Sequence, residues 1–412
     1  DSILGRVPDD WDITTSATPY QVKEIFKRTV DTGIKHGTVT VMIDKEGFEV
    51  TTYRVDGEYE DSRHPKEVTF TANLIEDLKR RDFTINAMAY NDQAGLVDVF
   101  EGMLDIRKKR IRCVGNPRER FSEDALRLMR AVRFSAQLGY EIEEETAEAI
   151  RELSPNLTHI SAERIQTELI KLIISPHPEN LRIAYELGIT GVVLPEFDAC
   201  MKTQQRNLHH CYSVGEHIIK SMQEIRPDKV MRLAMLFHDI GKPQTISQDD
   251  SGIHHFYGHP SVSEKMTKEI LRRLKFDNYT IYMVSNLVKF HDYEVEPGAK
   301  YVRRAIMKTG EDIFPLLFEV KEADIKAQSS YRREEKEKKL KEIHEIYDEI
   351  LACNQCVSLK GLAVTGRDLI EDAGMKPGKE LGEMLKKLLN VVIEEPAKNE
   401  KEILIKLARE FK

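Results

Sequence analysis

The pattern of hydrophobic and polar positions divides the chain into a short mixed region and a long helical region. In residues 1–110, strand-like and helix-like patterns alternate. From about Phe121 onward, apolar residues recur at spacings of three and four, which is typical of amphipathic helices. The spacing is clear in Ala125-Leu126-Met129-Val132-Phe134 and again in Ile165-Leu169-Leu172. The pattern therefore predicts an α+β protein, with a small mixed head followed by an all-helical remainder.

Within the mixed region, the sequence signals one helix and one pair of strands. Thr18-Pro19 is typical of a helix N-cap and first helical position, and we expect this helix to continue to about Thr32. Two strands are expected next, from Thr38 to Ile43 and from Phe48 to Arg54. The segment Asp44-Lys45-Glu46-Gly47 between them predicts a hairpin turn.

Prolines and charge runs divide the helical region further. Pro176, Pro178 and Pro195 interrupt its periodic pattern, and residues 332–350 are dense in Lys and Glu, as expected of a solvated helix face. We therefore expect four segments: a head over 1–112, a neck over 113–175, a helical body over 176–345 and a helical tail over 346–412.

Composition and charge narrow the class of protein only a little. The chain has 412 residues, of which 41% are hydrophobic and 32% charged, and its net charge is −8. An acidic chain is not coated in positive charge, but local basic stretches can still contact RNA phosphates. It has no run of about 18 apolar residues, so no membrane helix is expected. The five cysteines are few, which favours a cytoplasmic location.

A D-x-D pattern near the start of the chain predicts a metal site. Asp10 and Asp12 flank Trp11, and residues two apart in a strand point to the same face. Paired carboxylates repel each other unless a cation lies between them, and Mg²⁺ prefers carboxylates, phosphate oxygens and water. Glu49 is placed to add a third carboxylate. Such a trio suits phosphoryl transfer with two Mg²⁺ ions, although D-x-D is also a common surface or capping pattern.

Four motifs occur in an order that a known family shows. They are Leu4-Gly5-Arg6-Val7-Pro8-x-Asp10-x-Asp12-x-x-Thr15, Glu49-Val50-Thr51-Thr52-x-Arg54, Arg80-Arg81-Asp82-Phe83-Thr84-Ile85-Asn86-Ala87-Met88-Ala89 and Glu123-Asp124-x-x-Arg127-x-x-Arg130-Ala131-x-Arg133-Phe134. The set resembles the bacterial-type (class II) tRNA nucleotidyltransferases and poly(A) polymerases of the polymerase-β superfamily. The resemblance runs from the first residue to about Lys171 and is weaker beyond it.

The resemblance implies a five-stranded or similar polymerase-β-type head, followed by helical neck, body and tail domains. It also implies nucleotide addition to the 3′ end of RNA, with Asp10, Asp12 and Glu49 as catalytic residues. One motif of the family, a Gly-Gly or Gly-Ser followed closely by Arg-Asp, is met here only in Asp1. Because the chain begins within that motif and not with Met, we expect its natural N-terminus to be missing.

Asp124 and Arg127 offer a way to select C and A. They are three apart on a predicted helix, so we expect them to share a face. An aspartate accepts hydrogen bonds and an arginine donates them, which fits the amino group and ring acceptor that cytosine and adenine share. Uracil and guanine present the reverse pattern, and each buried mismatch costs about 1–3 kcal/mol. The resemblance implies this base-selecting role for both residues.

Further nucleotide contacts are implied by the same resemblance. Arg130 and Arg133 follow along the helix, and their charges suit triphosphate oxygens. Arg81 and Asp82 are candidates for the ribose, whose 2′-hydroxyl can donate and accept.

A second metal site is signalled by Leu233-Ala234-Met235-Leu236-Phe237-His238-Asp239-Ile240-Gly241-Lys242-Pro243, which resembles the HD phosphohydrolase superfamily. Such sites combine imidazole and carboxylate ligands around a transition metal. The order H…HD…D is supplied by His210, His238, Asp239 and Asp324, and His259 and His291 follow at plausible intervals. The alternative is a purely structural region that supports tRNA.

The leading functional hypothesis is addition of C, C and A to tRNA from CTP and ATP. A CC-only or A-only enzyme and a poly(A) polymerase remain alternatives. The segment 56–65 between the second and third motifs favours the complete reaction, because CC-only relatives tend to lack it. From other classes, an HD-type metal-dependent phosphohydrolase and a non-catalytic RNA-binding protein also remain. The expected partners are tRNA, CTP and ATP, no membrane is expected, and the oligomeric state stays open.

Overall fold

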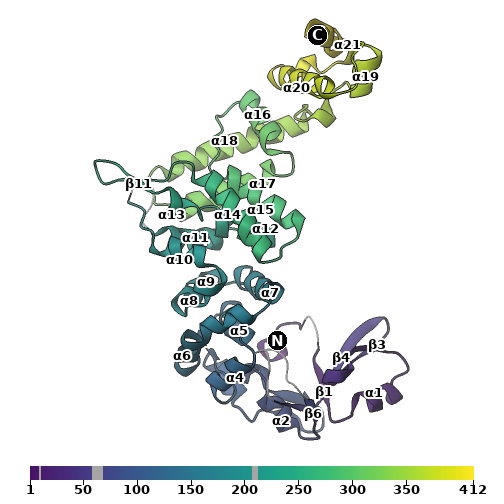
Figure 1. Cartoon of the computed structure of the whole chain (residues 1–412), viewed down its shortest axis with the longest axis vertical. Coiled ribbons are helices and arrows are strands. Elements are labelled where there is room, and N and C mark those ends of the chain that lie inside the picture. The colour runs from purple at the N-terminus through teal and green to yellow at the C-terminus, as the bar shows by residue number, and fades with distance from the viewer. Residues whose placement is uncertain (9–10, 58–67, 207–211) are drawn as a thin grey trace. The chain divides into compact units, whose positions relative to one another are not determined.

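The computed structural model describes residues 1–8, 11–57, 68–206 and 212–412. They form two compact units, Asp1–Pro195 and Glu196–Lys412, each with its own buried core. Among the described residues, every strand of three or more residues belongs to the first unit, and helices dominate the second (Figure 1). The α+β class and the change to a helical pattern near Phe121 are therefore confirmed.

The first unit contains short strands followed by helices. Its elements are β1 (Ile13–Thr15), α1 (Pro19–Ile25), β2 (Thr29–Gly33), β3 (Thr38–Ile43), β4 (Glu46–Thr52), β5 (Arg54–Asp56), β6 (Val68–Phe70), α2 (Leu74–Lys79), β7 (Ala89–Asn91), β8 (Gly95–Val97), α3 (Gly102–Arg107), β9 (Arg110–Ile111), α4 (Pro117–Glu123), α5 (Leu126–Leu138), β10 (Glu141–Ile142), α6 (Glu144–Leu153), α7 (Ala162–Ile173), α8 (Leu181–Glu186) and α9 (Ile189–Val193).

A four-stranded sheet in the order β1-β4-β3-β2 is the main β-structure of this unit. β1 runs parallel to β4, and the other neighbours are antiparallel. One face of the sheet packs on α1, where Val22 meets Val39, Val41 and Val50. Because side chains alternate along a strand, Glu49 lies on the opposite face, which is polar.

The predicted hairpin is confirmed, and the predicted length of the preceding helix is wrong. Asp44 and Lys45 form the turn with positive φ angles of 49° and 75°, and Ile43 pairs with Glu46. The helix begins at Pro19 as predicted but ends at Ile25. Its expected last turns instead form β2, because the β-branched residues of 29–32 favour a strand and pair with β3.

The second unit is a stack of helices with one short hairpin. Its elements are α10 (Pro195–Lys202, which begins at the unit boundary), α11 (Val214–Glu224), α12 (Lys229–Phe237), α13 (Lys242–Thr245), β11 (Ser247–Gln248), β12 (His254–His255), α14 (His259–Arg273), α15 (Asn278–Phe290), α16 (Ala299–Thr309), α17 (Phe314–Ala327), α18 (Arg333–Ala352), α19 (Gly366–Glu371), α20 (Lys379–Glu394) and α21 (Lys401–Glu410).

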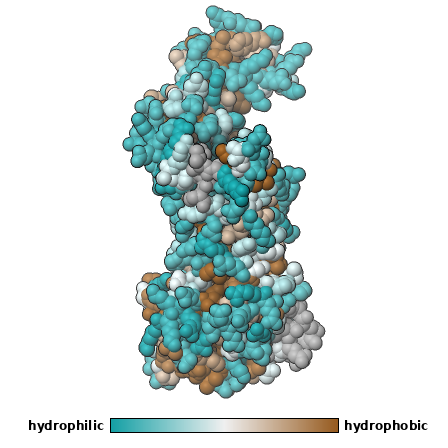
Figure 2. Space-filling model, turned by 90° about the vertical axis from the view of Figure 1, so that its left-hand side faces the viewer, coloured by the Kyte–Doolittle hydropathy of each residue, from teal (hydrophilic) through white to brown (hydrophobic). Residues whose placement is uncertain are grey.

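The helices α11, α12, α14, α15 and α17 pack against one another and form the centre of this unit. The Lys- and Glu-rich segment 332–350 lies largely within α18, in which Ile343 and Ile350 are the buried residues. Its solvated face is therefore confirmed, and the face of the molecule in Figure 2 is likewise mostly hydrophilic. Among the described residues, no helix combines the length and the apolar character needed to cross a membrane.

Candidate functional site

A pocket in the first unit brings a carboxylate together with three arginines. It has a volume of about 160 Å³ and is lined by Asp12, Ile13, Thr38, Thr51, Arg54, Arg80 and Arg81. These residues come from β1, β3, β4, β5 and the segment after α2, so the pocket opens on the polar face of the sheet. A cavity with this balance of charge suits a polyphosphate and a cation together.

The strand register brings two of the three predicted catalytic carboxylates to the same edge. Ile13 pairs with Val50, and Asp12 and Glu49 immediately precede these two residues in the chain. Both side chains are exposed. Asp10, the other half of the D-x-D, lies outside the described residues. Asp12 and Glu49 therefore each precede a residue of the same strand pair, and their role as ligands of a divalent cation stays a prediction.

A buried carboxylate that the sequence analysis did not select holds two of the pocket arginines. Asp77 of α2 is fully buried and accepts hydrogen bonds from Arg80 Nε at 3.0 Å and Nη2 at 2.8 Å. Its other oxygen is 3.4 Å from Nη2 of Arg81. The backbone amide of Arg54 also donates to Asp77, to Oδ1 at 3.2 Å. Asp77 therefore fixes Arg80 and Arg81 relative to the strand that carries Arg54.

Asp82 and Arg130 form a second ion pair in this unit. Arg130 Nη2 lies 2.6 Å from Asp82 Oδ2, and the amide of Phe83 donates to the other oxygen at 2.8 Å. Burial alone raises the pKa of Asp82, but attraction and hydrogen bonding to Arg130 outweigh it and hold the pKa below its ordinary value. Both predicted nucleotide-binding residues are thus charged and mutually bound, and their contacts with ribose and triphosphate stay predictions.

Asp124 lies outside the helix on which it was expected. It ends α4 with extended backbone angles, φ −141° and ψ 102°, and α5 begins at Leu126. The shared helix face predicted for Asp124 and Arg127 is therefore wrong. Aspartate favours such a position because its carboxylate accepts the exposed amide of Leu126, here at 3.0 Å. Arg164 of α7 binds the same carboxylate through both nitrogens, at 3.2 and 2.7 Å.

Arg127 is held by groups from two other segments, α4 and the residues after α2. Its Nη1 donates to Glu123 at 2.7 Å and to the carbonyl of Arg120 at 2.9 Å. Its Nη2 donates to the carbonyl of Arg80 at 3.1 Å, which links α5 to the segment that carries the pocket arginines. The guanidinium is therefore fixed in direction, and its contact with a base stays a prediction.

Arg133 has its partners inside the protein. It is 6% exposed, donates to Glu168 of α7 at 2.6 Å and to Gln137 at 2.7 Å, and lies 3.6 Å from the ring centroid of Phe134. Burial lowers its pKa despite the attraction of Glu168. Its predicted contact with triphosphate stays a prediction, and the structure gives it a role in joining α5 to α7.

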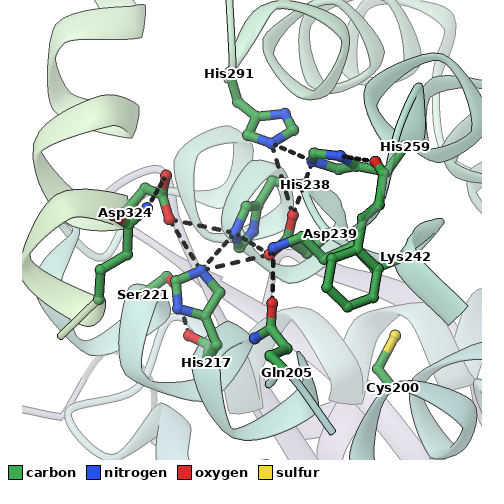
Figure 3. Close-up of polar contacts among 12 residues, drawn as sticks. Cys200, Gln205, His217, Ser221, His238, Asp239, Lys242, His259, His291 and Asp324 are labelled. Atoms are coloured by element: carbon green, nitrogen blue, oxygen red, sulfur yellow. Dashed lines mark hydrogen bonds and ion pairs between the residues drawn. The ribbon is translucent and has the colours of Figure 1, made fainter. Parts of the chain in front are cut away.

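In the second unit, three of the predicted HD residues meet a histidine that the sequence analysis did not select. His217 of α11 lies beside His238 and Asp324: its Nε2 is 3.1 Å from His238 Nε2 and 2.9 Å from Asp324 Oδ1 (Figure 3). His210 lies outside the described residues. Asp239 Oδ2 is 3.3 Å from His238 Nε2 and 3.5 Å from His217 Nε2. These ligand atoms converge as they do around a transition metal.

A second group of ligands adjoins the first through Asp239. His259 Nε2 is 3.3 Å from Asp239 Oδ1 and 3.2 Å from His291 Nε2. Lys242 contacts the aspartate from the other side, with Nζ 2.6 Å from Oδ2. Burial alone raises the pKa of Asp239, but His238 and Lys242 hold it well below its ordinary value. The aspartate is therefore an anion at the centre of the cluster.

Comparison with known proteins decides the family. Family models match residues 1–112 (poly A polymerase head domain), 139–201 (probable RNA and SrmB-binding site of polymerase A) and 244–408 (tRNA nucleotidyltransferase domain 2, putative). The CCA-adding enzyme of Enterococcus faecalis is 33% identical to this chain, over 99% of the chain and 89% of its own length. This chain belongs to the CCA-adding enzyme family. The family resemblance predicted from the four motifs is confirmed.

Other CCA-adding enzymes are similar to this chain in sequence or in fold. The CCA-adding enzyme of Leuconostoc mesenteroides is 34% identical over 100% of this chain and 90% of its own length. The structure of the Bacillus stearothermophilus CCA-adding enzyme in complex with CTP superposes with a TM-score of 0.73 and 29% identity, over 100% of this chain and 90% of that one. The Thermotoga maritima CCA-adding enzyme complexed with tRNA shares the fold, with a TM-score of 0.58 and 19% identity over 100% and 88%.

Asp77, Arg164 and His217 are among the residues that the sequence analysis missed. Asp77 precedes the two pocket arginines by three and four positions, a spacing that signals ion pairs on a helix. Arg164 is remote in sequence from Asp124, so no local pattern shows the pair. His217 stands in an ordinary amphipathic helix, and only the packing of α11 against α17 shows its role.

Proposed function

We propose that this chain adds C, C and A to the 3′ end of tRNA, using CTP and ATP. The observation that carries the proposal is the full-length similarity to CCA-adding enzymes, together with the pocket at which Asp12 meets Arg54, Arg80 and Arg81. The Bacillus stearothermophilus CCA-adding enzyme, whose structure superposes with a TM-score of 0.73, was solved in complex with CTP. CTP is one of the two nucleotides that this proposal requires.

In this proposal, the head binds the triphosphate and the cations. Asp10, Asp12 and Glu49 would hold two Mg²⁺ ions, which would supply positive charge beside the triphosphate. The 3′-hydroxyl of the tRNA displaces pyrophosphate from the incoming nucleotide. Arg54, Arg80 and Arg81 bind the phosphate oxygens that face the pocket, and Asp77 positions the last two of these side chains.

The incoming base is selected by Asp124 and Arg127, from neighbouring segments rather than one helix face. The carboxylate accepts a hydrogen bond from the amino group of C or A, and the guanidinium donates to the ring nitrogen beside it. Arg164 and Glu123 orient these two groups and so exclude the reversed pattern of U and G. Arg81 and Asp82 lie near the ribose, and Arg130 and Arg133 near the phosphates.

The four segments have separate tasks in this proposal. Residues 1–112 carry the catalytic head, 113–175 select the nucleotide, 176–345 form the body and 346–412 the tail. The helical segments bind tRNA by its shape and phosphates rather than by base sequence.

Extension of a tRNA transcript that lacks its CCA end tests the proposal directly. With Mg²⁺, two additions from CTP alone and a third only when ATP is present are expected. A long A ladder would instead identify a poly(A) polymerase, and C additions without A a partial enzyme. Absence of incorporation by the folded protein would overturn the proposal.

A second function is favoured by the HD cluster of the second unit. There His217, His238, Asp239 and Asp324 converge in the order H…HD…D, and all four come from helices or helix ends of one packed core. We propose that they hold a transition-metal ion and that the site acts as a metal-dependent phosphohydrolase. Metal analysis after reconstitution with Mn²⁺ tests it: an ion lost in His217→Ala is expected, and equal metal content in both proteins would exclude this site.

A further inference from the structure

Two threonines that the proposed function does not use line the pocket of the first unit. Thr38 of β3 and Thr51 of β4 both line it, together with Asp12 and the three arginines. They are cross-strand partners in the antiparallel pair of β3 and β4, so their side chains leave the sheet next to each other. Their chain neighbours Val39 and Val50 point the other way, into the core against α1. The two hydroxyls therefore belong to the polar face on which the pocket opens.

The hydroxyl groups of this threonine pair bind each other. Thr38 Oγ1 lies 3.1 Å from Thr51 Oγ1, and either oxygen can be the donor. Only one of the two hydroxyl hydrogens is needed for that bond. Among the residues that the structure describes, neither hydroxyl has another hydrogen-bond partner. The threonine pair therefore keeps one hydroxyl hydrogen that has no acceptor in the described part of the chain.

Other threonines of the same sheet use their hydroxyl hydrogens inside the protein. Thr14 donates to the backbone carbonyl of Thr51 at 3.2 Å, and Thr52 donates to the backbone carbonyl of Ala17 at 2.8 Å. Because a carbonyl only accepts, each of these two hydroxyls has spent its one hydrogen. The threonine pair differs from them, since it lines a pocket and still has a hydrogen to donate.

The charged donors of the pocket come from other segments of the chain. Arg54 lies in β5, whereas Arg80 and Arg81 follow α2, where Asp77 holds both. A phosphate group carries oxygens that point in several directions, so donors from several segments bind it better than donors from one. The threonine pair adds an uncharged donor from the central strands β3 and β4.

We propose that Thr38 and Thr51 contact the triphosphate of the incoming nucleotide, and that the threonine pair donates one hydrogen bond to a phosphate oxygen. This inference rests on the proposed function and deepens it, because it assigns the contact between the triphosphate and the sheet. The hydroxyl that donates to the phosphate also accepts the hydrogen bond of its partner. Hydrogen bonds that follow one another in this way polarise and strengthen each other.

The proposed contact serves both nucleotides of the reaction. CTP and ATP carry the same triphosphate, so a hydrogen bond to a phosphate oxygen does not depend on the base. It would hold the triphosphate against β3 and β4, beside Asp12. Base selection remains with Asp124 and Arg127, which do not line this pocket.

A pair of threonines on neighbouring strands also stabilises a sheet, and the two roles predict different effects of substitution. A pair that serves only the sheet changes the unfolding of the head and leaves polyphosphate affinity as it is. A pair that contacts phosphate changes that affinity. Valine is suited to the test, because it has nearly the shape and the strand preference of threonine and lacks the hydroxyl.

Binding of inorganic tripolyphosphate in the presence of Mg²⁺ tests the contact without tRNA and without a base. Titration calorimetry of the full chain measures its Kd. Thr38→Val/Thr51→Val is expected to raise this Kd about tenfold, as for loss of a hydrogen bond to a charged group. Each single variant is expected to lose less affinity, because the hydroxyl that remains keeps its hydrogen and no longer gives it to a partner.

Thr32→Val is the matched control. Thr32 and Thr40 form another hydroxyl pair of this sheet, with their Oγ1 atoms 2.9 Å apart, and neither residue lines the pocket. The Kd of Thr32→Val for tripolyphosphate is expected to equal that of the wild type. Circular dichroism establishes that all the variants are folded. Equal Kd values in Thr32→Val and Thr38→Val/Thr51→Val would overturn the inference.

Steady-state CCA addition provides a second readout. In Thr38→Val/Thr51→Val, KM is expected to rise about tenfold for CTP and equally for ATP. The value of kcat is expected to stay unchanged, because the triphosphate is bound alike before and during the reaction. A KM that rises for one nucleotide only, or a fall in kcat alone, would contradict a contact with the triphosphate.

The two readouts separate this inference from the function on which it rests. CCA addition by the wild type, with KM and Kd unchanged in Thr38→Val/Thr51→Val, would overturn the inference alone. Tripolyphosphate binding that depends on the threonine pair, without nucleotide incorporation by the wild type, would support the inference and overturn the proposed function. A wild type that binds no tripolyphosphate would overturn the inference whether or not it incorporates nucleotides.

Discussion

The carboxylate of Asp124 forms an ion pair with the guanidinium of Arg164, with two nitrogen–oxygen contacts of 3.2 and 2.7 Å. The two residues come from different elements, since Asp124 ends α4 and Arg164 lies in α7. Their side chains are 18% and 23% exposed, so the carboxylate is fixed yet reachable. A carboxylate held in one orientation can favour one hydrogen-bonding pattern of a base over another, whereas a freely rotating carboxylate discriminates less.

We expect Arg164→Met to weaken nucleotide selection. Without its partner, the Asp124 carboxylate turns freely, and kcat/KM for CTP and ATP is expected to fall about tenfold, or 1.4 kcal/mol. Incorporation of UTP relative to CTP is expected to rise. Single-turnover extension of tRNA with each nucleotide measures both. Arg118→Met, which breaks only the exposed pair with Glu152, is the control, and identical nucleotide ratios in the two variants would contradict the role of Arg164.

We expect Asp77→Asn to weaken both the head and its triphosphate binding. The buried carboxylate neutralises Arg80 and Arg81, and loss of one partner of a buried ion pair costs on the order of 3 kcal/mol. Urea unfolding followed by circular dichroism measures the stability, and KM is expected to rise equally for CTP and ATP. Asp31→Asn, which removes an exposed pair with Lys23, is expected to change neither quantity. A KM that rises for one nucleotide only would indicate a base contact instead.

The parts of this molecule that were predictable from sequence are those governed by local patterns. The hairpin around Asp44 and Lys45 and the start of α1 at Pro19 follow from turn and capping preferences. The end of α1 was not predictable, because pairing of β2 with β3 overrides the helical reading of residues 26–32. Likewise, His238 and Asp239 are adjacent and visible, whereas His217 joins them only through packing.

Acid is expected to remove the contribution of the Asp82–Arg130 pair to stability. The folded-state pKa of Asp82 lies below its unfolded value, so this contribution is fully present above the unfolded pKa of about 3.9 and is lost as pH falls through the folded pKa. The free energy of unfolding of the wild type should therefore exceed that of Asp82→Asn by a constant amount from pH 5 to 8, and the gap should narrow below pH 4. If the difference in free energy of unfolding between the two proteins stays constant down to the lowest pH at which the head is folded, the Asp82–Arg130 pair does not make this contribution to stability.

Metal removal is expected to destabilise the second unit. A ligand that binds only the folded state at 100 times its Kd stabilises it by about 2.7 kcal/mol, and the ion that we propose for His217, His238 and Asp324 would act in this way. For a unit of this size, that corresponds to a rise in unfolding temperature of roughly 5–10 °C on adding Mn²⁺ to the chelator-treated chain, measured by scanning calorimetry. The quantity compared is the rise in unfolding temperature that Mn²⁺ causes in each protein. A variant that is less stable without metal therefore remains informative. His217→Ala should lose most of this gain, whereas His254→Ala, in the β12 strand outside both ligand groups, should keep it. An equal gain in both variants would place the stabilising ion elsewhere in the chain.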